Sequence, residues 1–99
     1  MKHMPASPKA LKDLFALFAA IETQRESEML LHDILTPQEL EDIAERWQLI
    51  QALASGMTQR AVAKKCGVSI SKITRGSHEL QHGTGGFKHF LEKMRKNIR

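Results

Sequence analysis

The chain has 99 residues, 41% of them hydrophobic and 26% charged, with a formal net charge of +4. This length allows one domain with a limited core, so a partner subunit would help it to bury apolar surface, while the composition excludes a wholly disordered chain. The single cysteine, Cys66, excludes an intrachain disulfide framework and a four-cysteine zinc site.

The apolar segments are too short for a membrane protein. The longest near-continuous apolar run, from Leu14 to Ile21, has eight residues, whereas a membrane-spanning helix needs about 20. No hydrophobic secretion signal follows Met1. We therefore expect a cytoplasmic protein without membrane contact.

The charged residues are distributed unevenly. Residues 22–45 contain eight Asp or Glu and one Arg, whereas residues 46–78 contain six Lys or Arg and no acidic residue. A basic segment can neutralise phosphates, while a polyanion would repel an acidic one. The distribution favours nucleic acid as a partner, although a solvated, charged helical surface would have the same composition.

The N-terminal third predicts an arm and two helices. Residues 1–8 hold two prolines and no periodicity, so we expect a loose arm there and a single domain over residues 9–99. The helix predicted from Lys9 to Thr23 is apolar on nearly all sides. One subunit of this size cannot bury all of that apolar surface, so we expect the helix to insert between subunits. A short helix is predicted from about Ser27 to Ile34.

A long core helix is predicted after Leu35. Thr36 is a capping residue, Pro37 takes the first helical position, and Glu39 follows at the third. Ser55-Gly56 offers the C-terminal stop. The apolar face of this helix comprises Leu40, Ile43, Ala44, Trp47, Ile50, Leu53 and Ala54.

Residues 58–80 have the spacing of a helix-turn-helix motif. A short helix from about Gln59 to Lys65 is followed by a turn at Gly67 and by a second helix that Ser69 caps. Val62, Ala63, Val68 and Ile73 supply the apolar and small contacts between the two helices. Gly83 to Gly86 breaks the pattern, and a last helix is predicted from about Phe87 to Met94. With no strand or repeat evident, the fold class is all-α.

The second helix of such a motif enters the major groove with its N-terminal side chains facing base edges. Lys72 could donate to guanine there, Thr74 could touch a thymine methyl group, and Ile70 could offer an apolar contact. The other candidates for contact with bases or phosphates are Gln59, Arg60, Lys64, Lys65, Ser69, Ser71, Ser77 and His78.

Three motifs, Leu35-Thr36-Pro37, Thr58-Gln59-Arg60 and Ile73-Thr74-Arg75-Gly76-Ser77, resemble the Trp repressor family, and the likeness spans roughly residues 11–94. The resemblance implies a six-helix subunit in an intertwined homodimer. It also implies a transcriptional repressor that L-tryptophan activates as corepressor, that binds a palindromic operator in double-stranded DNA, and that controls tryptophan biosynthesis genes.

The resemblance also implies a tryptophan site. Arg46 and Arg75 match the two ligand arginines of the family, and two guanidinium planes can sandwich an indole while one pairs with the carboxylate. The polar end of the ligand is expected at Thr36 and near the carbonyls of Asp33 and Leu35. Gly76, within the shared motif, belongs to the same expected site.

The chain departs from the family at three places. Glu79 stands where the family prototype has a small hydroxyl residue near the ligand's ammonium group; it could pair with that group, crowd the site, or indicate a different amine ligand. His78 replaces an asparagine that follows the Arg-Gly-Ser sequence. The connection Gly56-Met57-Thr58 is one residue shorter, which could change the tilt of the helix-turn-helix.

Other functions find less support in the sequence. His78 and His82 have a metal-binding spacing but lack a third ligand, so no metal site is expected. Cys66 belongs to no recognisable dyad and should be packed, so we expect no enzyme and no cofactor beyond the corepressor. The remaining alternatives are a helical module that binds an acidic protein, and a helix-turn-helix regulator that responds to another ligand or to none.

Overall fold

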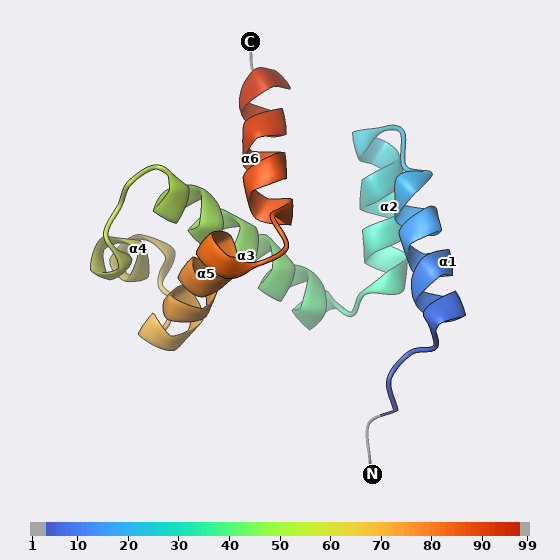
Figure 1. The fold of residues 1–99 in the computed structure, drawn as a ribbon, viewed down its shortest axis with the longest axis horizontal. Coiled ribbons are helices and arrows are strands. Elements are labelled where there is room, and N and C mark those ends of the chain that lie inside the picture. The colour runs from blue at the N-terminus through green and yellow to red at the C-terminus, as the bar shows by residue number, and fades with distance from the viewer. Residues whose placement is uncertain (1–3, 98–99) are drawn as a thin grey trace. The chain divides into compact units, whose positions relative to one another are not determined.

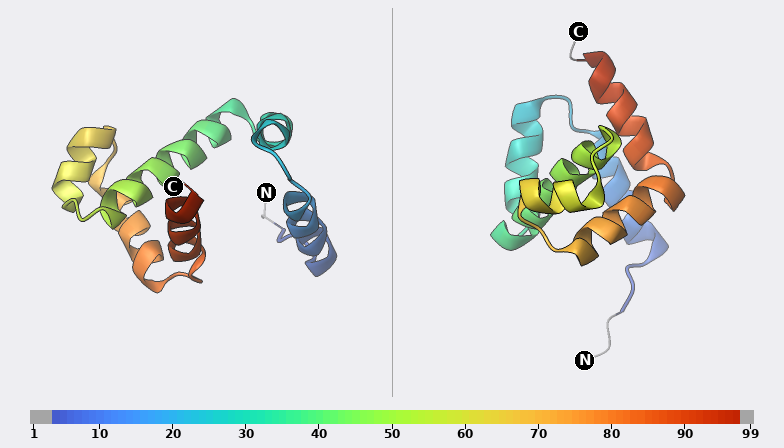
Figure 2. Two further views of the ribbon diagram at one scale, coloured as in Figure 1. Left: turned by 90° about the horizontal axis from the view of Figure 1, so that it is seen from above. Right: turned by 90° about the vertical axis from the view of Figure 1, so that its left-hand side faces the viewer.

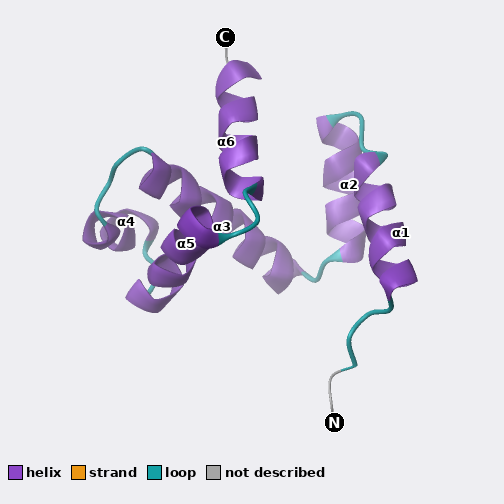
Figure 3. Cartoon of the chain, in the orientation of Figure 1, coloured by secondary structure: helices purple, strands orange, loops and turns teal. Residues whose placement is uncertain are grey.

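The computed structural model describes residues 4–97 of the chain, and this part consists of six helices joined by loops, with no strand (Figures 1 and 3). The helices are α1 (Pro8–Ala19), α2 (Gln24–Ile34), α3 (Pro37–Ala54), α4 (Gln59–Cys66), α5 (Ile70–His82) and α6 (Gly86–Asn97). This confirms the all-α, six-helix prediction. None of the helices in the described part is both long and apolar enough to cross a membrane.

The boundary between α1 and α2 corrects the sequence prediction. Helix α1 ends at Ala19, four residues before the predicted Thr23, and α2 begins at Gln24, three residues before the predicted Ser27. The reason is a capping pair: Thr23 Oγ1 accepts the Glu26 N–H at 3.1 Å, while Glu26 Oε1 accepts the Glu22 N–H at 2.8 Å. The first bond satisfies the N–H of the third residue of α2, and the second satisfies the N–H of the residue that precedes the cap.

The chain divides into two compact units, Met1–Pro37 and Gln38–Arg99. In the first unit no described residue is buried, and the apolar side chains of α1 are open to solvent. Phe15 is 66% exposed, for example, and Leu11, Leu17 and Phe18 are each 40% or more exposed. Residues 1–3 of the predicted arm lie outside the described part, and Pro8 already belongs to α1. The single domain over residues 9–99 stays a prediction.

The core of the second unit lies where α4 and α5 meet α3 (Figure 2). Ile50, Val62 and Ile73, one from each helix, are fully buried, which confirms the core assignment of Ile73. Leu49 is also buried, although the predicted apolar face of α3 missed it, whereas Ile43 from that face is 45% exposed. Cys66 is partly buried against the core, as expected.

Helices α4 and α5 begin at the residues predicted from the sequence. Thr58 Oγ1 accepts the Ala61 N–H at 3.1 Å at the start of α4, and Ser69 Oγ accepts the Lys72 N–H at 3.3 Å at the start of α5. Gly67 ends α4 with φ of 67°, a left-handed conformation that a residue with a Cβ rarely adopts. These caps fix where α5 begins, and therefore which of its residues share a face.

Candidate ligand pocket and nucleic-acid interface

A pocket of about 490 Å³ lies between α3, α5 and the start of α6, within the second unit. Its lining comprises Asp42, Glu45, Arg46 and Leu49 of α3, Lys72, Arg75, Gly76 and Glu79 of α5, and Phe87 of α6. On both long walls the residues follow the spacing i, i+3, i+4, i+7, which gathers side chains on one face of a helix. The two walls are thus the facing sides of α3 and α5.

The floor of the pocket depends on Gly76. This residue is buried, and a Cβ added to it would meet Leu49 Cδ1 at 2.5 Å and Ile50 Cδ1 at 3.5 Å. The first distance is shorter than real Cβ contacts allow, so a side chain at residue 76 would have to displace Leu49, which itself lines the pocket. Glycine therefore lets α5 approach α3 closely at this level.

Aromatic packing forms the third side. The ring of Phe87 stacks on that of Trp47, with 6.3 Å between the ring centroids and 26° between the planes. Both residues pack against the core of the second unit. The contact holds the beginning of α6 against α3 and places one apolar ring at the edge of the pocket.

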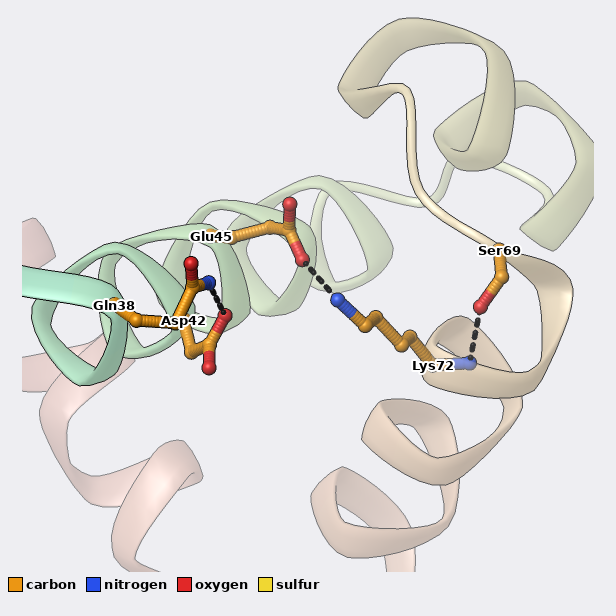
Figure 4. Close-up of polar contacts among 5 residues, drawn as sticks. All are labelled: Gln38, Asp42, Glu45, Ser69 and Lys72. Atoms are coloured by element: carbon orange, nitrogen blue, oxygen red, sulfur yellow. Dashed lines mark hydrogen bonds and ion pairs between the residues drawn. The ribbon is translucent and has the colours of Figure 1, made fainter.

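The charged side chains of the pocket are balanced: three carboxylates, Asp42, Glu45 and Glu79, accompany three cations, Arg46, Lys72 and Arg75. Figure 4 shows Lys72 reaching from α5 to α3, where its Nζ lies 3.0 Å from Glu45 Oε1. Asp42 lies one helical turn before Glu45, and its Oδ1 accepts a hydrogen bond from Gln38 Nε2 at 2.9 Å. Carboxylates and cations side by side suit a ligand that carries charges of both signs.

The structure brings together four of the residues expected to bind ligand, namely Arg46, Arg75, Gly76 and Glu79. The other three, Asp33, Leu35 and Thr36, belong to the first unit, at the end of α2 and in the connection to α3. Sequence reasoning missed the ligand-pocket residues Asp42, Glu45, Leu49 and Phe87. The signal for two of them was available, because Asp42 and Leu49 stand at i−4 and i+3 from Arg46.

Most residues expected to contact DNA lie on the exposed surface of α4 and α5. The exposed ones are Gln59, Arg60, Lys64, Lys65, Ser69, Ile70, Ser71, Thr74 and His78, and Ser77 is half-buried. Two of them interact directly, because Thr74 Oγ1 and Gln59 Oε1 lie 3.2 Å apart, with the hydroxyl as donor. Lys72 differs from the rest, since it lines the pocket and pairs with Glu45.

No group of three or more His, Cys, Asp or Glu side chains within the described residues could hold a metal ion. His78 and His82 stand one turn apart on α5, with their ring centroids 5.0 Å from each other. The described residues around them supply no further ligand for a metal.

The sequence is similar to known proteins over nearly its whole length. The family profile described as "Trp repressor protein" matches residues 9–95. A Trp operon repressor homolog of Chlamydia trachomatis serovar L2 is 42% identical over 86 residues, which cover 86% of this chain and 74% of that protein. A Trp operon repressor homolog of Xylella fastidiosa strain M23 is 36% identical over 86 residues, which cover 86% of this chain and 91% of the relative.

The fold is similar to solved structures as well. The crystal structure of a candidate Trp repressor from Staphylococcus aureus superimposes with a TM-score of 0.83 and 25% sequence identity, covering 90% of this chain and 89% of that one. A TrpR like protein from Eubacterium eligens superimposes with a TM-score of 0.81 at 23% identity, covering 87% of this chain and 89% of that one. At that identity the second likeness concerns the fold alone.

Proposed function

The chain belongs to the Trp repressor family, and from this premise we propose that it is a homodimeric repressor that binds a palindromic operator when L-tryptophan occupies its pocket. Members of this family are transcriptional regulators and not enzymes. The tryptophan corepressor, the operator, the dimer and the control of tryptophan biosynthesis genes belong to the proposal.

The observation that carries the proposal is the position of two arginines in one pocket. Arg46 reaches it from α3 and Arg75 from α5, and the second of these helices also belongs to the helix-turn-helix. Guanidinium groups stack on aromatic rings and pair with carboxylates, so the pair suits an aromatic amino acid. Glu79 lines the same pocket, and its carboxylate is the proposed acceptor of hydrogen bonds from the ammonium group of such a ligand.

The shared helix explains how ligand and DNA would be coupled. Side chains of α5 contribute to the pocket wall at Arg75 and Glu79, while Ile70, Ser71 and Thr74 are exposed on the same helix. A ligand that fills the pocket favours the placements of α5 that leave room for it. It thereby shifts the population toward conformations in which the helix-turn-helix can bind DNA. By linkage, operator binding must tighten ligand binding by the same factor.

The DNA-binding part of the proposal rests on charge and on the motif. Residues 46–78 are basic and contain no acid, and α4 and α5 have helix-turn-helix bounds with both caps in place. The proposed contacts are Gln59, Arg60, Lys64, Ser69, Ile70, Ser71, Thr74, Ser77 and His78. Lys72, also expected from the sequence to contact DNA, lines the pocket and pairs with Glu45.

The homodimer is proposed from the open apolar surface of the first unit. Leu11, Phe15, Leu17 and Phe18 of α1 are each 40% or more exposed in the single chain, and water-exposed apolar area of this kind marks an interaction surface. A second copy of the chain would cover it. On the resemblance to the family, the proposed tryptophan site also includes Asp33, Leu35 and Thr36.

Titration calorimetry of the purified protein with L-tryptophan tests the proposed ligand. We expect one tryptophan per subunit, because the pocket forms within the residues of one second unit. Heat is the preferred signal, since intrinsic Trp47 would complicate a fluorescence assay. Absence of heat at several temperatures would exclude tryptophan and leave a helix-turn-helix regulator for another amine ligand, a candidate favoured by the three carboxylates in the pocket.

A further inference from the structure

Lys72 points to the pocket side of α5. An α-helix turns by about 100° per residue, so Lys72 and Thr74 project roughly 200° apart, whereas Lys72, Arg75, Gly76 and Glu79 share one face. The contacts agree with this geometry: Lys72 pairs with Glu45 of α3, while Thr74 donates to Gln59 of α4. The two residues therefore serve opposite faces of the helix.

The ion pair between Lys72 and Glu45 is exchangeable. The side chain of Lys72 is 58% exposed and that of Glu45 is 36% exposed, and solvent-exposed pairs of this kind add little to folding stability. Lys72 carries three N–H donors, and its Nζ has Glu45 as its described partner at 3.0 Å. A carboxylate from outside could therefore replace Glu45 at small cost.

Arg75 stands beside this pair. It follows Lys72 by one helical turn and lines the same pocket, so the two cations present a positive patch on the wall of α5. A carboxylate is best held by charge-assisted hydrogen bonds from such groups. On the facing wall, Asp42 accepts a hydrogen bond from Gln38. Glu45 is therefore the carboxylate of that wall that pairs with the positive patch, through Lys72.

We propose that Lys72, together with Arg75, receives the carboxylate of the amino-acid ligand, and that Glu45 competes with the ligand for Lys72 in the empty pocket. This inference rests on the proposed function, because it concerns the polar end of the same ligand. Lys72 is then a specificity-determining residue of the pocket in place of the base contact predicted from the sequence. Ligands without a carboxylate gain nothing from it.

Two single substitutions test this inference because they should act in opposite directions. In Lys72→Gln the carboxylate loses a charge-assisted partner, and the dissociation constant for L-tryptophan should rise about three- to tenfold. In Glu45→Gln the competitor is weakened, and the dissociation constant should fall about two- to fivefold. Calorimetry without DNA measures both, and Lys93→Gln, an exposed lysine of α6 outside the pocket lining, should leave the constant unchanged.

The possible outcomes separate the roles. If both substitutions weaken tryptophan binding equally, the ion pair merely holds the two helices, and the inference is overturned. It is overturned as well if Lys72→Gln leaves tryptophan binding unchanged and lowers the affinity for duplex DNA without ligand. If the unsubstituted protein binds no tryptophan, then tryptophan is not the ligand and the proposed function itself fails. A loss of tryptophan binding in one variant alone would not have this meaning.

Discussion

Replacing Ile73 by alanine is expected to lower the free energy of unfolding by about 2–5 kcal/mol. Ile73 of α5 is fully buried and shares the core with Ile50 of α3 and Val62 of α4, so the shortened side chain leaves a cavity where three helices meet. A domain of this size has a total stability of about 5–15 kcal/mol. The loss would therefore be a large part of the stability.

Urea denaturation measures this effect through the midpoint at constant slope. The protein concentration must be equal for all variants, because the stability of a dimer depends on it. Ile70→Ala is the matched control: the same change on the same helix, at a residue that is 53% exposed, should cost a small fraction of that amount. Equal losses in the two variants would contradict the assignment of the core.

Replacing Arg75 by alanine is expected to weaken L-tryptophan binding by about 10- to 100-fold while the protein stays folded. The guanidinium is exposed and lines the pocket, so its removal leaves the buried core intact. Hydrogen bonds to charged groups contribute about 1.5–3 kcal/mol, and each 1.4 kcal/mol is a factor of ten in affinity. Titration calorimetry measures the loss directly.

Arg60→Ala controls for the removal of a positive charge. Arg60 is also exposed, but it belongs to α4 and does not line the pocket, so tryptophan affinity should stay unchanged while DNA affinity falls. A protein with Arg75→Ala that binds tryptophan as tightly as the unsubstituted chain would remove Arg75 from the site, and with it the observation on which the proposed function depends.

The local structure of the second unit was largely predictable because its signals are local. Helix α4 begins at the predicted Gln59, Gly67 forms the predicted turn, and Ser69 caps α5 as expected. The boundary between α1 and α2 was predicted wrongly, because the apolar periodicity continued to Thr23, whereas Thr23 and Glu26 form a capping pair that begins α2 at Gln24. Periodicity alone does not show where one helix stops.

Contacts between distant residues were harder to predict. Glu45 and Lys72 are 27 residues apart, and each resembles an ordinary surface charge in the sequence. Ile43 fitted the predicted apolar face of α3 but is exposed, while Leu49 was missed but is buried. The packing of α4 and α5 against α3 decides which of its faces is buried, and the apolar periodicity of α3 alone does not show this. Arg46, Arg75, Gly76 and Glu79 were found through the family resemblance, which already contains such contacts.

The central claim is that tryptophan raises the affinity of this protein for its operator. The most direct measurement uses duplexes selected from a random pool by the protein with L-tryptophan, and then compares their affinity with and without the amino acid over a range of salt concentrations. We expect about 5- to 150-fold tighter binding with tryptophan and a steep loss of affinity as salt rises. Equal affinity in both conditions would contradict the claim, and a shallow salt dependence would point to a protein partner instead of DNA.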